Sequence, residues 1–180
     1  MFLLSFDNGS EAIARIPSSA IVGNSYAVTA SEVATMDYLR RFCGVKIPRV
    51  LAWSCAPYRK VVGTDFILME RTPGVLLADR WHLVQNDEAH HVVMNALNVE
   101  LRISGTAFSQ IGSLYFKGDV SPELQQRPLF LNEEDNESEP ADLYRIGPST
   151  DRLWWCGRRS RLSIHRGPCK LCATSVLTRG

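Results

Sequence analysis

Two residues of opposite charge, Arg15 and Glu32, lie where the sequence predicts a strand followed by a helix. Glu32 starts a series at helical spacing that continues with Met36, Leu39 and Cys43, so it shares a helix face with apolar side chains. A carboxylate on a buried helix face is costly unless a positive group meets it, and Arg15 is the nearest upstream candidate. A strand cation held by a helix glutamate is an arrangement that contacts nucleotide phosphates.

Glu32 also fits a purely structural role. Thr29-x-x-Glu32 has the pattern of a capping box, in which the glutamate side chain accepts a hydrogen bond from the backbone N–H of Thr29. We expect the helix to begin at Thr29, with Gly44 suited to its C-terminal cap. The sequence favours neither role over the other.

The cysteines and tryptophans give weaker patterns. Cys169-x-x-Cys172, with His165 and Cys156 upstream, has the donor types of a zinc site, but the chain contains only one such cysteine pair. We therefore expect no bound metal. No cysteine has the strand–turn–helix context of a nucleophilic hydrolase. The adjacent tryptophans at 154 and 155 lie near arginines and could stack on bases, but packing in the core is the better interpretation.

The composition is that of a folded intracellular protein. Hydrophobic residues make up 45% of the 180, and 20 Lys and Arg nearly cancel 19 Asp and Glu. That balance predicts neither a nucleic acid nor a membrane as partner. The N-terminus has no clear targeting signal, and no apolar run approaches the roughly 20 residues needed to cross a bilayer. Five cysteines favour reduced thiols in a cytoplasmic or mitochondrial protein.

Turn signals and periodicity predict a small antiparallel sheet with one helix over residues 1–70. Asn8-Gly9 between two apolar runs indicates that the chain opens with a hairpin. Residues 50–53 and 65–69 have the composition of a third and a fourth strand.

Residues 71–168 predict a partial helical region, and we assign no structure to a divergent tail over 169–180. A short helix is expected over 76–84, followed by a longer one from Asn86 or Asp87 to about Ser104. The longer helix has a broad apolar face that we expect to be buried, formed by Val92, Val93, Ala96, Leu97, Val99 and Leu101.

Three further segments complete the region after the long helix. Residues 108–116 predict a tight hairpin that turns at Gly112-Ser113, and residues 144–148 a short extended piece. The acidic segment 131–142 is expected to be an exposed loop without function. The fold class is therefore α+β.

Seven short motifs occur in the order expected of a known group: IARIP, ASEVATMDYLR, IPRVLAW, DFILMERTPG, GSLYF, YRIGP and RGP. Over about residues 2–168 the chain resembles fungal aminoglycoside-phosphotransferase-like, or choline-kinase-like, proteins of the protein-kinase-like superfamily. It looks close to the fungal altered-inheritance-of-mitochondria proteins. The resemblance implies ATP-dependent phosphoryl transfer to a small-molecule hydroxyl, with ATP and Mg²⁺ as cofactors.

The same resemblance implies a kinase-like small lobe, a hinge and the beginning of a helical large lobe. Arg15 stands where the family has its phosphate-contacting basic residue, on the third strand of the small lobe, and Glu32 stands where the helix glutamate lies. Met69 and Glu70 stand at the hinge, whose backbone would hydrogen-bond an adenine. Arginine offers a rigid fork where lysine offers a movable point charge, so the phosphate contact differs in detail.

The resemblance does not extend to the catalytic residues. A kinase-like enzyme needs an H-x-D loop and a later metal-binding aspartate, yet no histidine of this chain is followed two residues later by aspartate. We expect a truncated family member that lacks the first strand and is inactive alone, with an unknown acceptor. The alternative is a non-catalytic remnant that binds a nucleotide or another protein. In either case we expect exposed apolar surface and self-association.

Overall fold

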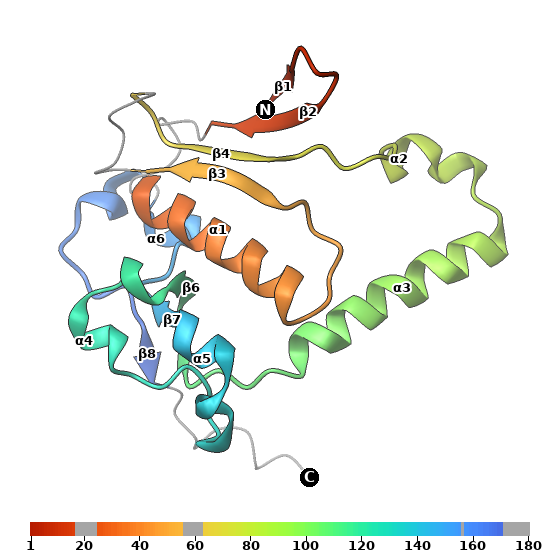
Figure 1. Ribbon diagram of the computed structural model, residues 1–180. Coiled ribbons are helices and arrows are strands. Elements are labelled where there is room, and N and C mark those ends of the chain that lie inside the picture. Colours follow the sequence, from red (N-terminus) through yellow and green to blue (C-terminus); the bar gives the residue numbers. More distant parts are fainter. Residues whose placement is uncertain (17–24, 56–62, 156, 171–180) are drawn as a thin grey trace, which may run out of the picture.

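A four-stranded antiparallel sheet forms one layer of the protein. The computed structural model describes residues 1–16, 25–55, 63–155 and 157–170, and shows an α+β fold (Figure 1). The strands β1 (Phe2–Ser5), β2 (Glu11–Arg15), β3 (Val50–Ser54) and β4 (Phe66–Glu70) lie in the order β1-β2-β4-β3. Every neighbouring pair is antiparallel, as predicted.

The predicted opening hairpin is confirmed. β1 and β2 pair from Phe2 opposite Ala14 to Ser5 opposite Glu11. Gly9 has a positive φ of 78°, and the Asn8 side chain accepts a hydrogen bond of 2.9 Å from the backbone N–H of Ser10. The local turn chemistry therefore sets the register of the first two strands.

Helix α1 (Ser25–Arg41) is the second layer, and it is covered on both sides (Figure 1). Val33 packs with the sheet residues Ile67 and Met69, and Ala30 packs with Tyr115 on the opposite side. The helix starts at Ser25 rather than at Thr29, so Thr29 is an interior helical residue and is completely buried. The predicted capping box is therefore wrong, because its cap position lies inside the helix.

Strands β6 (Ser113–Phe116) and β7 (Tyr144–Gly147) form the third layer as an antiparallel pair. β5 (Gln110–Ile111) pairs instead with β8 (Cys169–Lys170), so the described part of the tail forms a strand. The hairpin predicted at Gly112-Ser113 is therefore wrong. β6 finds its partner about 30 residues later because pairing with β7 buries Tyr115, whose hydroxyl donates to the Pro148 carbonyl at 2.8 Å.

The acidic segment has more structure than the exposed loop that its composition predicts. It contains the 3-10 helix η3 (Glu134–Glu137) and the short helix α5 (Glu139–Leu143), in which Ala141 is buried. The Asn136 side-chain carbonyl accepts hydrogen bonds of 2.9 Å from the backbone N–H groups of Leu129 and Phe130. The charges lie outside while one uncharged amide fixes the backbone.

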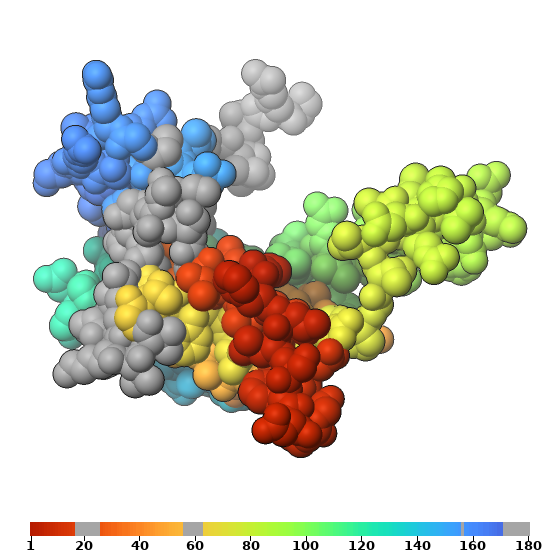
Figure 2. All heavy atoms as spheres, turned by 90° about the horizontal axis from the view of Figure 1, so that it is seen from above, coloured from red at the N-terminus to blue at the C-terminus, as the bar shows by residue number. Residues whose placement is uncertain are grey.

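The elements α2 (Leu77–Arg80), η1 (Trp81–Leu83) and α3 (Asn86–Ser104), here called the arm, extend away from the body (Figure 2). No residue in these three elements is buried, so the buried face expected on α3 is wrong and the exposed apolar surface is confirmed. Near the C-terminal end of α3, Arg102 links the arm to the body by donating a hydrogen bond of 3.2 Å to the Gly44 carbonyl. None of the helices in the described ranges is long and apolar enough to cross a membrane.

The remaining elements are short. They are η2 (Lys117–Asp119), α4 (Pro122–Gln125), α6 (Arg152–Trp155) and η4 (Gly157–Arg161). Cys43 and Cys55 are buried. The main core cluster gathers around Tyr38 and Tyr144, between α1 and the β6–β7 pair.

Candidate nucleotide site

The candidate site lies on the face of β2 that points toward α1. Ile13, in the middle of β2, packs against the apolar cluster of Val33, Ile67 and Met69. Because alternate residues of a strand point to the same face, Glu11 and Arg15 lie on that face at its two ends. A row of acidic, apolar and basic side chains therefore runs along one strand.

At one end of this row, Arg15 forms an ion pair with Glu32 of α1. The two side chains are 34% and 30% exposed, so the pair lies at the rim of the core rather than within it. An ion pair as open as this adds little stability by itself, since water competes for both charges. The Nη1 atom of Arg15 is buried against Glu32, while about a third of the whole side chain remains accessible.

At the other end of the row, Glu11 forms an ion pair with Arg71, directly after β4. The two residues and Pro73 line an open cavity of about 340 Å³. That volume is at the lower end of the range typical of small-molecule sites. The sequence motifs did not point to Glu11 or Arg71. The period-two spacing of Glu11, Ile13 and Arg15 was the available signal for Glu11.

Met69 and Glu70, the residues assigned to the hinge, lie at the end of β4 between β2 and β3. Met69 is buried in the cluster against α1, and Glu70 pairs with Arg40 at 3.3 Å. The backbone N–H of Glu70 donates to the Arg49 carbonyl at 2.9 Å. A base beside this strand would therefore have to receive its hydrogen bond from the exposed backbone that follows, at 71–74.

Two larger cavities lie elsewhere. A groove of about 500 Å³ is lined by α1, β3 and Phe116, with Arg40 and Arg41 at its rim. Both arginines are paired with carboxylates, Arg40 with Glu70 and Arg41 with Glu139. A cavity of about 390 Å³ contains Asp119, and burial raises the pKa of its carboxyl although a hydrogen bond from Tyr26 partly offsets this. Sequence reasoning missed both cavities because their walls come from distant segments.

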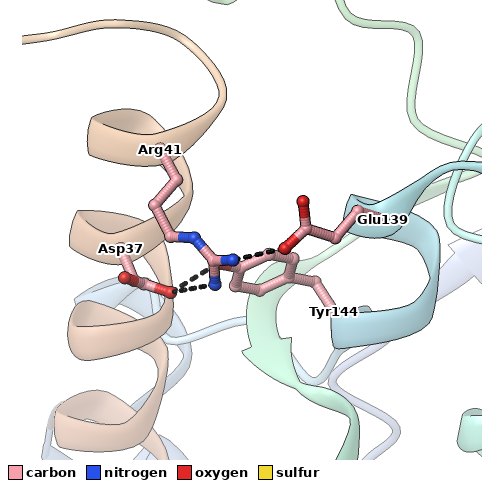
Figure 3. Close-up of polar contacts among 4 residues, drawn as sticks. All are labelled: Asp37, Arg41, Glu139 and Tyr144. Atoms are coloured by element: carbon pink, nitrogen blue, oxygen red, sulfur yellow. Dashed lines mark hydrogen bonds and ion pairs between the residues drawn. The ribbon is translucent and has the colours of Figure 1, made fainter.

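A polar network joins α1 to the third layer (Figure 3). The Tyr144 hydroxyl donates to Asp37 at 2.6 Å, and Arg41 pairs with both Asp37 and Glu139. Burial, with added effects from Asp37, raises the pKa of Tyr144 well above its usual range, so its hydroxyl remains a donor. This network fixes the second turn from the C-terminal end of the helix that carries Glu32.

The described residues contain no group of three or more metal-ligating side chains. Of the four residues considered for zinc, Cys156 and Cys172 lie outside the described residues, while His165 and Cys169 are exposed.

Comparison with known proteins finds fungal relatives. No protein-family model and no solved structure matches the chain. It is 38% identical over 176 residues to a subtelomeric hrmA-associated cluster protein of Aspergillus fumigatus, covering 98% of this chain and 32% of that protein. It is 34% identical over 161 residues to altered inheritance of mitochondria protein 9, mitochondrial, of Candida tropicalis, covering 84% of this chain and 25% of that protein.

A further relative with the same printed name, from Candida dubliniensis, is 32% identical over 191 residues, covering 98% of this chain and 30% of that protein. The homologues are thus fungal altered-inheritance-of-mitochondria proteins and subtelomeric cluster proteins. The chain spans between 25% and 32% of the length of these relatives. Their names state no enzymatic activity.

Proposed function

We propose that this chain supplies the nucleotide-binding part of an aminoglycoside-phosphotransferase-like, kinase-like protein and does not transfer phosphate alone. The observation that carries the proposal is the ion pair between Arg15 of β2 and Glu32 of α1. A helix carboxylate that holds a strand cation, with an open cavity farther along the same strand, suits a ligand with phosphates at one end.

The dimensions support this arrangement. Glu11 and Arg15 are four residues apart on one strand, so their Cα atoms are separated by about 13 Å. That span is of the order of the distance from the base to the outer phosphates of a nucleoside triphosphate. The base would lie in the cavity beside Arg71 and Pro73, and the phosphates would meet Arg15.

Each part of the site has a definite role in the proposal. Arg15 neutralises phosphate charge, and Glu32 fixes its guanidinium in place. ATP would bind as its Mg²⁺ complex, in which the metal would offset part of the phosphate charge. The chain has no H-x-D sequence to orient an acceptor hydroxyl, which is why we propose binding without turnover.

The relatives also support a cellular location. Several of them are named as mitochondrial proteins. We extend this to the present chain as part of the proposal, with an intracellular and mitochondrial location.

The test is binding of Mg·ATP to the purified chain, measured by calorimetry, with the variants Arg15→Met, Arg15→Lys and Glu32→Gln. We expect Arg15→Met to weaken binding at least about tenfold, since a hydrogen bond to a charged group contributes about 1.5–3 kcal/mol. Arg15→Lys keeps the positive charge and should lose much less. Glu32→Gln should fall between them, because the arginine stays but is no longer held.

Two results would contradict the proposal. Equal affinity in wild type and Arg15→Met would remove Arg15 from the site. ATP hydrolysis or phosphoryl transfer that disappears in Arg15→Met would show that the chain is catalytic on its own.

A second candidate function is favoured by the arm. Its apolar side chains, including Leu97 at 46% exposed and Leu101 at 68%, lie in solvent. In this alternative the chain is a non-catalytic module that binds another protein through this surface. Charged substitutions at these two leucines would then leave the affinity for ATP unchanged.

A further inference from the structure

The nearly neutral net charge of the chain conceals a local imbalance. Residues 152–170, here called the basic platform, contain five arginines and one lysine and no aspartate or glutamate. The whole chain has a formal charge of only +1. Positive charge is therefore concentrated in one short segment. Salt screens this charge only weakly at an anionic surface that lies within a Debye length of the segment.

Arg166 organises the basic platform from inside. Its guanidinium lies 4.1 Å from the centre of the Trp155 ring. It donates hydrogen bonds to the carbonyl oxygens of Arg159 at 2.8 Å and Leu162 at 2.9 Å, and a longer one to Trp154 at 3.4 Å. Backbone carbonyl groups from three parts of the segment thus accept hydrogen bonds from the Arg166 guanidinium. No carboxylate in the described part of the chain pairs with Arg166.

The side chains around this centre are exposed. Leu153, Trp154 and Leu162 are 63%, 45% and 52% exposed. Arg158 and Arg161 are exposed beside them, and no ion pair is formed by either within the described ranges. The segment forms a protruding end of the molecule (Figure 2). A protein that needed no partner here would have little reason to expose a tryptophan and two leucines among arginines that form no ion pair within the described ranges.

We propose that the basic platform binds the surface of a membrane that contains anionic phospholipids. Exposed Trp and Leu side chains enter the boundary between headgroups and acyl chains, while arginines next to them contact the lipid phosphates. Tryptophan is enriched at that interface, because its ring is amphipathic. The inference is independent of nucleotide binding, since the platform shares no residue with the Arg15 site.

The aromatic residues favour a membrane over a nucleic acid. Base stacking needs free ring faces, but the Trp155 ring is covered by Arg166 and its indole N–H donates to the Ser149 carbonyl at 2.7 Å. Of the two tryptophans in the platform only Trp154 is exposed, and the same segment also exposes the aliphatic side chains of Leu153 and Leu162. Aliphatic side chains are stabilised by burial among acyl chains, but they contribute little to the binding of a sugar–phosphate backbone.

The arm offers a matched control. It also exposes a tryptophan beside an arginine, because Trp81 is 49% exposed and follows Arg80. However, residues 75–105 carry four carboxylates and two arginines. If exposed apolar side chains were sufficient, both the arm and the basic platform would bind lipid. The proposal predicts that only the basic platform binds, because only it combines apolar exposure with net positive charge.

The experiment is co-sedimentation of the full 180-residue chain with phosphatidylcholine vesicles, with and without phosphatidylserine, in low and high salt. We expect binding only with phosphatidylserine and a decrease in high salt. The double variant Arg158→Gln, Arg161→Gln should weaken binding about 25-fold, at about fivefold for each arginine. Trp154→Ala should also weaken it, while the control Arg80→Gln, Trp81→Ala should bind like wild type.

Circular dichroism of every variant checks that the fold is retained. Equal binding to both kinds of vesicle, or a loss in the arm variant that matches the loss in the platform variant, would overturn the proposal. No vesicle binding, together with binding of single-stranded oligouridine RNA that is lost in Arg158→Gln, Arg161→Gln, would overturn it in favour of RNA.

Discussion

Tyr144 connects three elements through a single hydroxyl. Its side chain is completely buried in the main core cluster, and its ring lies edge-on to Tyr38 at 5.5 Å. The hydroxyl reaches Asp37, which also receives Arg41. A buried hydroxyl that donates to an ionised carboxylate is among the stronger single interactions in a protein.

We therefore expect Tyr144→Phe to lower the free energy of unfolding by about 1.5–3 kcal/mol, measured by urea denaturation. Tyr38→Phe is the matched control, because Tyr38 lies in the same cluster but its hydroxyl is 3.4 Å from Thr106 Oγ1. It should lose only about 0.5 kcal/mol, as expected for a long neutral contact. A loss in Tyr38→Phe as large as that in Tyr144→Phe would contradict this assignment.

The candidate site could be predicted from the sequence only in part. The position of Glu32 on an apolar helix face indicated a cationic partner, and the structure pairs it with Arg15. The competing capping interpretation was local and equally consistent with the sequence, because it depended on where the helix begins. Glu11 and Arg71 could not be paired in advance, since they are 60 positions apart and belong to no shared motif.

Among the elements, β6 and β7 show why local turn signals fail. Gly112-Ser113 has the composition of a hairpin turn, but β6 runs beside β7, with Ser113 opposite Gly147. Gly147 packs closely against the Tyr115 ring: a Cβ at this position would lie 2.6 Å from Tyr115 Cδ2. The pairing is thus selected by side-chain packing between distant strands, which short sequence patterns do not encode.

Gly147→Ala should consequently destabilise the protein by about 1–3 kcal/mol, because Tyr115 is buried and cannot move aside cheaply. Gly118→Ala serves as control, since a Cβ there meets no atom within 4 Å. Thermal unfolding followed by circular dichroism compares the two. If Gly147→Ala unfolds at the temperature of the control, the close approach of β7 to β6 is not a constraint on stability.

The bounds of α3 were more predictable than the pairing of β6 with β7. The boundaries of α3 follow from the apolar periodicity and from Gly105, and the backbone N–H of Gln85 reaches Glu88 at 3.2 Å as part of a capping box. Burial could not be predicted in the same way. Periodicity shows that a helix has an apolar face, but it does not show whether anything in the chain covers that face.

At the scale of the whole molecule, the arm is the feature least suited to an isolated monomer. Val93, Leu97 and Leu101 are 50%, 46% and 68% exposed at helical spacing. An apolar face of this kind normally lies against another element or another protein. In the longer relatives, about two thirds of the chain lies outside the region of similarity.

We expect the purified chain to self-associate, so that light scattering reports a mass above its 20.2 kDa. Leu97→Lys with Leu101→Glu should shift the distribution to the monomer, because the two charges would have to be buried in any shared apolar interface. Asn95→Lys with Asn98→Glu introduces the same charges at exposed polar positions of α3 and should change little. A monodisperse wild-type monomer would contradict this expectation.

The position of α1 between two layers has a consequence for how the sequence can change. From 26 to 41, only Arg40 and Arg41 are exposed, so nearly every side chain of this helix is shaped by a neighbour on one layer or the other. α3 is two residues longer and has no buried residue. Tolerance to substitution should therefore differ strongly between the two helices. Most changes in α1 would disturb a packed layer, whereas α3, apart from Arg102 and its hydrogen bond to Gly44, could vary without disturbing the buried core.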